Sequence, residues 1–114
     1  MENSVYNKLI HRGFLVDAGI AIKNVWAING NGANEYYEVD FVANKGSKKF
    51  YIQSAYSIID EEKIKQEEKS LDSINDNFDK VIITFDDFIT YHRNQKGYIV
   101  MNLLEFLLNK EYLN

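Results

Sequence analysis

The chain has 114 residues, a formal net charge of -4 and 46% hydrophobic residues, which predicts one folded domain over residues 1–114 rather than a disordered chain. The acidic balance argues against tight nonspecific binding to nucleic acid, which depends on Lys and Arg neutralising phosphates, and leaves only a local basic patch open. The chain contains no cysteine, which excludes disulfides and thiol catalysis. No apolar run approaches the roughly 20 residues of a membrane span, so we expect a cytoplasmic protein without a membrane partner.

The first part of the chain is predicted to form a helix followed by a strand, a turn and a second strand. Apolar residues at helical spacing predict a helix over 2–12, and Gly13 follows it as a C-terminal cap. Two short β-leaning runs come next, over 14–16 and 19–26. The sequence Asn-Gly-Asn-Gly at 29–32 then signals a turn.

The central part of the chain is predicted to form a hairpin. Residues 36–43 alternate, which places one set of side chains on one face of a strand: Tyr37, Val39, Phe41 and Ala43. Glu38 and Asp40 share the other face. After a turn at 44–47, residues 49–55 alternate again, with Gln53 and Ala55 on the same face. Such a hairpin would bring Asp40 and Gln53 together.

An amphipathic helix is predicted over 60–74, and Ser57 with Asp60 resembles a capping box ahead of it. The β-branched run over 80–85 predicts a buried strand that pairs in parallel with an earlier strand.

The end of the chain is predicted to contain a loop, a short edge strand and a last helix. Asp86, Asp87 and residues 92–97 indicate the loop, and residues 98–101 the edge strand. Asn102 and Glu105 form a second capping box ahead of a helix that runs to about Tyr112. The resulting order, α-β-β-β-α-β-(β)-α, indicates an α/β fold with a mixed four- to five-stranded sheet and helices on both faces.

Several stretches together resemble the restriction-endonuclease-like PD-(D/E)XK superfamily. The resemblance is closer to the domain of unknown function at the C-terminus of many prokaryotic AAA-type ATPases. The stretches are ENSVYNKLIHRGF, YEVDFVA, KFYIQSAYSI, EEKIKQEEKSLDSI, DKVIITFDD and MNLLEFLL. The resemblance implies a restriction-endonuclease-like fold and a partner in the N-terminal ATPase domain of the same protein. ATP binding would belong to that domain, because no GxxxxGK[ST] motif occurs here.

The resemblance also implies a degenerate nuclease site. Active members of the superfamily use an acid in the opening helix, an Asp on the second strand and a (Glu/Gln)-x-Lys on the third. The matching residues in this chain are Glu2, Asp40 and Gln53, and Ala55 stands at the lysine position. The missing lysine would help to position the attacking water and stabilise charge on the phosphate, so we expect no catalysis.

The same residues are the candidate ligands for a weakly bound Mg²⁺ or Mn²⁺ ion. Oxygen donors suit these ions, but two carboxylates and an amide supply little negative charge. Simpler roles stay open for Asp40 and Gln53. Asp40 could cap a turn or pair with a lysine, and Gln53 could hydrogen-bond to the neighbouring backbone.

Three functions are therefore compared. The first is a non-catalytic, nuclease-like accessory domain of an ATP-binding protein that docks DNA or a protein partner. The alternative is an active Mg-dependent DNA endonuclease or resolvase-like enzyme with a relocated lysine, for which Lys48 and Lys49 are the candidates. The third is a pure protein-interaction domain, with a homodimer formed through a sheet edge or through the closing helix 103–108.

Overall fold

The computed structural model of the chain describes residues 1–24, 35–59 and 61–114, leaving aside the side chains of residues 22–24, 35 and 36. The predicted turn at 29–32 lies outside the described residues, and so does Asp60, the partner of Ser57 in the predicted capping box. The elements are α1 (Glu2–His11), β1 (Leu15–Asn24), β2 (Glu35–Lys45), β3 (Lys48–Ala55), α2 (Glu61–Asp72), β4 (Asp79–Thr84), β5 (His92–Arg93), β6 (Ile99–Asn102) and α3 (Leu103–Leu108).

The strands form a six-stranded mixed sheet in the order β1-β2-β3-β4-β6-β5. Strands β1, β2 and β3 form an antiparallel meander, and β4 and β6 then add in parallel. The parallel pairing of β4 with β3 confirms the prediction, because α2 supplies the crossover that a parallel connection needs. The prediction of a loop over 92–97 is wrong for His92 and Arg93, which pair with β6. Strand β6 is consequently not the edge strand.

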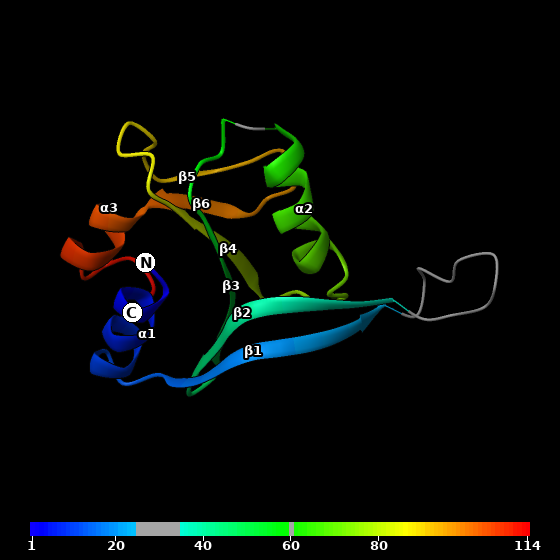
Figure 1. The fold of residues 1–114 in the computed structure, drawn as a ribbon. Helices are drawn as coiled ribbons and strands as arrows, with labels where there is room; N and C mark the ends of the chain where they lie inside the picture. The colour runs from blue at the N-terminus through cyan, green and yellow to red at the C-terminus, as the bar shows by residue number, and fades with distance from the viewer. Residues whose placement is uncertain (25–34, 60) are drawn as a thin grey trace.

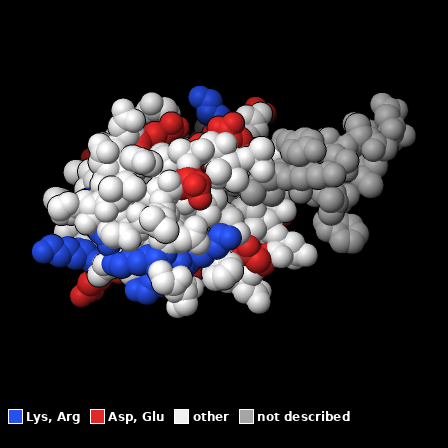
Figure 2. Space-filling model, turned by 90° about the horizontal axis from the view of Figure 1, so that it is seen from below, with Lys and Arg blue, Asp and Glu red and all other residues white. Residues whose placement is uncertain are grey.

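The helices lie on both faces of the sheet, with α1 and α3 on one face and α2 on the other (Figure 1). This arrangement confirms the predicted α/β class with a mixed sheet flanked by helices. The turn between β2 and β3 lies at the end of the sheet that faces the viewer in Figure 2. None of the helices within the described ranges is long and apolar enough to span a membrane.

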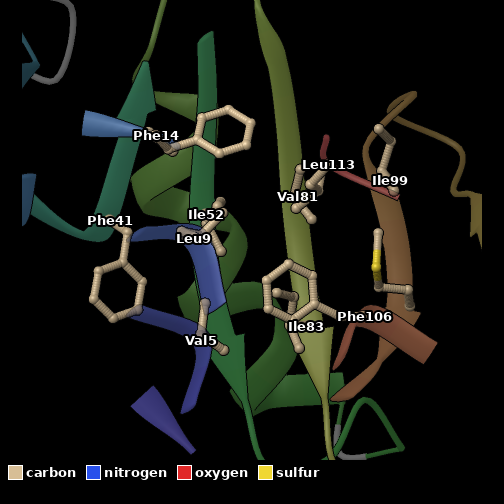
Figure 3. Packing of buried hydrophobic residues seen from close by; sticks show 12 residues of the cluster. Val5, Leu9, Phe14, Phe41, Ile52, Val81, Ile83, Ile99, Phe106 and Leu113 are labelled. Carbon is tan, nitrogen blue, oxygen red and sulfur yellow. The ribbon is translucent and has the colours of Figure 1, made fainter. Parts of the chain in front are cut away.

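Two apolar clusters hold the helices onto the sheet. The larger cluster lies under α1 and α3, and Figure 3 shows its residues: Val5, Leu9, Phe14, Phe41, Ala43, Ile52, Val81, Ile83, Ile99, Met101, Phe106 and Leu113. The smaller cluster lies under α2 and consists of Val39, Val42, Tyr51, Ala55, Leu71, Ile82 and Val100. Strand β4 is apolar throughout its middle because alternate residues enter the two clusters.

Helix α1 ends where the sequence predicts. The Gly13 N–H donates to the Ile10 carbonyl, and the Phe14 N–H donates to the Leu9 carbonyl. These two bonds form a Schellman motif, which requires the positive φ of 92° at Gly13. Leu9 and Phe14 pack in the same cluster and complete the motif.

Helix α3 begins as predicted but ends earlier. The Asn102 side chain accepts a hydrogen bond from the Glu105 N–H at 2.7 Å, which confirms the capping box. The helix stops at Leu108 instead of about Tyr112. The residues after Leu108 are not helical. The Arg12 guanidinium donates hydrogen bonds to the carbonyls of Phe106, Asn109 and Tyr112.

Candidate functional site

Strands β2 and β3 separate at the two residues that the sequence singles out. Their ladder runs from the pair Lys45 and Lys48 to the pair Phe41 and Ile52. Beyond the end of this ladder, hydrogen bonds from side chains to the backbone take the place of backbone–backbone hydrogen bonds. The Gln53 Oε1 accepts from the Asp40 N–H at 2.9 Å, and the Asp40 Oδ2 accepts from the Ser54 N–H at 2.8 Å. We call this arrangement of Asp40, Gln53 and Ser54 the fork, and it confirms that the hairpin brings Asp40 and Gln53 together.

Gln53 has no free polar group directed at solvent. Its side chain is 5% exposed, and its Nε2 donates to the Glu38 carbonyl at 3.4 Å. A buried amide is stable only when such groups are satisfied. The simpler interpretation of Gln53, a hydrogen bond to the neighbouring backbone, is therefore confirmed.

The local geometry of the fork depends on Gly19 in the neighbouring strand. The β1–β2 register pairs Ala18 with Phe41 and Ile20 with Val39 on either side of Gly19 and Asp40. Gly19 has a φ of 63°, which strains any L side chain. Val39 packs under α2, whereas Phe41 packs under α1 and α3. The prediction that Val39 and Phe41 share a face is therefore wrong, because β2 changes face at Asp40.

Asp40 of the fork and three carboxylates near it, Glu2, Glu38 and Glu67, form a group of four. Burial is the largest cause that raises the pKa of Asp40, and the charges of Glu2 and Glu38 raise it further. The hydrogen bond from the Ser54 N–H lowers it. Burial likewise raises the pKa of Glu67, with contributions from the charges of Asp40 and Glu2, and a hydrogen bond from Gln53 lowers it. Among the described residues, none of the four forms an ion pair with a cation.

Glu67 was missed in the sequence, where residues 61–69 indicate a solvated helix face. A signal for it was present. Glu67 comes three residues after Ile64 and four before Leu71, so it shares their helix face. Ile64 and Leu71 both pack onto the sheet, and Glu67 is half-buried beside them.

The lysine position of the superfamily motif is filled by a packed methyl group. Ala55 is 5% exposed and contacts the cluster under α2. The candidate relocated cations lie at the other end of β3. Lys49 is four residues from Gln53, about 13 Å along a strand, and its Nζ lies 5.2 Å from the Tyr51 ring centroid. Neither Lys48 nor Lys49 replaces the missing lysine in this arrangement.

The donor set does not fit a divalent metal ion. Gln53 Oε1 and Asp40 Oδ2 each already accept a backbone N–H group, so each oxygen has one lone pair fewer to offer a metal ion. In the part of the chain that the structure describes, no three His, Cys, Asp or Glu residues are grouped so that they could hold a metal. The predicted ligands Glu2, Asp40 and Gln53 thus lie near one another without forming a coordination site.

Comparisons with known proteins add no relative. No protein-family model matches the chain, and no curated protein matches it significantly. Arguments about function therefore depend on the geometry of this chain.

Proposed function

We propose that the chain is a non-catalytic, nuclease-like accessory domain of the PD-(D/E)XK type, which docks DNA or a protein partner for an ATP-binding protein. The fold class supports this proposal. A helix, an antiparallel meander, a crossover helix and a parallel strand follow one another, which is the arrangement that the sequence resemblance leads us to expect.

The fork is the observation that carries the proposal. A hydrolytic site must offer a carboxylate to a metal and a cation to the phosphate. Here the Asp40 carboxylate and the Gln53 amide are engaged in closing the separation of β2 and β3. The lysine position holds Ala55, and the carboxylates beside the site form no ion pair with a cation among the described residues. A phosphodiester at this place would meet negative charge without a compensating cation.

The surface offers a feature suited to a protein partner. Tyr56 and Phe85 leave the ends of two neighbouring strands, and their ring centroids are 5.3 Å apart. Tyr56 is 74% exposed and Leu104 is 58% exposed. Phe85 and Leu104 line one shallow pocket of about 250 Å³. Contiguous exposed apolar side chains of this kind are typical of contact surfaces.

A cleavage assay tests the proposal. Supercoiled, single-stranded and branched DNA are incubated with the protein and Mg²⁺ or Mn²⁺, beside Asp40→Asn protein prepared in the same way. We expect no metal-dependent cleavage by either protein. Cleavage by the wild type that the Asp40→Asn substitution abolishes would overturn the proposal and establish the endonuclease alternative.

A further inference from the structure

The turn between β2 and β3 carries three lysines at the end of the sheet opposite the fork. Lys45 pairs with Lys48 across the turn, and Lys49 follows on β3. We call Lys45, Lys48 and Lys49 the lysine turn. Figure 2 views the end of the molecule that contains this turn and shows Lys and Arg side chains as a nearly continuous row with few acidic groups beside them.

Within the part of the chain that the structure describes, no side-chain carboxylate neutralises the charges of the lysine turn. Lys45 Nζ donates to the Arg12 carbonyl at 2.8 Å and lies 5.5 Å from the Phe14 ring centroid. Lys49 Nζ lies 5.2 Å from the Tyr51 ring centroid, and Lys48 Nζ donates to the Asn114 carbonyl. Across residues 1–24, 35–59 and 61–114, none of the three forms an ion pair. Carbonyls and rings hold these ammonium groups while their charge remains available to an anion.

A groove lined by aromatic side chains adjoins the lysine turn. It has a volume of about 370 Å³, and its lining includes Lys48, Phe50 and Arg93 together with two acidic residues, Asp79 and Glu111. Tyr91 and Tyr112 line it too, and their rings stack with centroids 4.5 Å apart and an interplanar angle of 17°. Arg93 is held beside them by bonds to the Gly97 carbonyl and Asp79. Lys48 thus belongs both to the lysine turn and to an aromatic groove.

We propose that the lysine turn and this groove bind single-stranded nucleic acid. Proteins that hold single strands combine cations along the backbone with aromatic rings that stack on bases, and both occur here around Lys48. An anionic membrane suits the surface less well. The rings beneath the lysines are covered, with Phe14 at 2% and Tyr51 at 6% exposure, so they cannot insert into lipid.

The charge distribution also sets the strength and the direction of binding. With a net charge of -4 over the chain and only three unpaired lysines at the turn, binding will be weak and sensitive to salt. The carboxylates around the fork repel phosphates from the other end of β3. The inference deepens the docking part of the proposed function, on which it rests, by naming a surface and a kind of nucleic acid, and it holds whether or not the fork cleaves DNA.

Fluorescence anisotropy with a labelled oligothymidylate tests the inference at low salt. The test variant is Lys48→Gln/Lys49→Gln, and the matched control is Lys65→Gln/Lys69→Gln, which removes the same charge from exposed positions on α2. We expect the test variant to bind at least about tenfold more weakly, and the slope of log K against log salt to fall by roughly 1.4, about 0.7 for each lost phosphate contact. The control keeps most of the wild-type affinity.

A third variant, Tyr91→Leu, separates stacking from charge. We expect roughly a fivefold or greater loss of affinity, since stacking of one base is lost, with an unchanged salt slope. Equal binding by the lysine variant and the wild type would overturn the inference. So would a wild type that ignores the oligonucleotide, binds duplex equally well, or binds only phosphatidylglycerol vesicles. Cleavage that depends on Asp40 would refute the proposed function alone and leave this inference in place.

Discussion

The two ends of strand β3 carry opposite charge and use it differently. At the turn, Lys48 and Lys49 form no ion pair with a side chain of the described residues. At the fork, Gln53 lies among carboxylates that form no ion pair with a cation within the same ranges. A phosphodiester-cleaving site needs both kinds of group within a few ångströms. The lysines and the carboxylates thus lie at opposite ends of one strand rather than in one site.

The largest expected effect comes from Arg12, a structural cation near the lysine turn. The Arg12 guanidinium donates to the carbonyls of Phe106, Asn109 and Tyr112 and lies 4.8 Å from the Phe106 ring centroid. We expect Arg12→Gln to lower the free energy of unfolding by about 2–4 kcal/mol, because charged hydrogen bonds to several carbonyls are lost. Urea denaturation measures it.

Lys49→Gln is the matched control for this prediction. Lys49 contacts only ring faces, so its replacement should change the free energy of unfolding by less than about 0.5–1 kcal/mol. Equal losses in the two variants would contradict the division between a structural Arg12 and a lysine turn available for binding.

The next effect concerns the fork. Asp40→Ala leaves the Ser54 N–H without its acceptor, and an unsatisfied buried donor costs about 1–3 kcal/mol. Relief of the repulsion from Glu2 and Glu38 offsets part of this loss. Asp40→Asn keeps an oxygen acceptor and should retain most of the stability. Thermal unfolding of both variants and the wild type measures these differences in stability. Equal stability of all three proteins would mean that the fork contributes nothing to the stability of the fold.

The smallest effect is a gain. Glu67→Gln removes one charge from the carboxylates around the fork and keeps an oxygen acceptor for Gln53. Because Glu67 is only half-buried and solvent screens its charge, we expect about 0.5 kcal/mol of added stability near neutral pH. Denaturation at low and high salt checks the cause, since salt should reduce the gain. A loss of stability would show that the Glu67 charge is itself needed.

The dependence of stability on pH follows from the same carboxylates. Their folded-state pKa values are raised above the ordinary values of 3.8 for Asp40 and 4.5 for Glu67. Between the unfolded and the folded pKa, the folded state binds more protons, so stability increases as the pH falls through the folded pKa. We expect the wild type to gain more stability than Glu67→Gln as the pH falls from about 7 toward 4.5, the ordinary pKa of Glu67. Parallel curves for the two proteins would contradict this origin.

Much of the fold could be predicted from the sequence because local chemistry agrees with it. Three features depend only on residues close to them in the sequence. They are the helix end at Gly13, the capping box at Asn102 and Glu105, and the β-branched strand over 80–84. The change of face at Asp40 could not be predicted, because it depends on Gly19 in the neighbouring strand. The early end of α3 depends on Arg12, about 94 residues away in sequence.

The candidate site was predicted in its membership but not in its chemistry. Alternation in two strands was enough to place Asp40 beside Gln53. The sequence could not show that both side chains bond the backbone of the opposite strand, since that depends on where the ladder ends. Glu67 joins them from a helix whose orientation on the sheet follows from packing.

Titration calorimetry with Mg²⁺ and Mn²⁺ tests the central claim most directly, with the wild type and Asp40→Asn measured side by side. If the fork is closed by its own hydrogen bonds, neither protein shows saturable metal binding that depends on Asp40. Saturable binding by the wild type that the Asp40→Asn substitution removes would show that the fork opens to hold a metal, and would contradict the account.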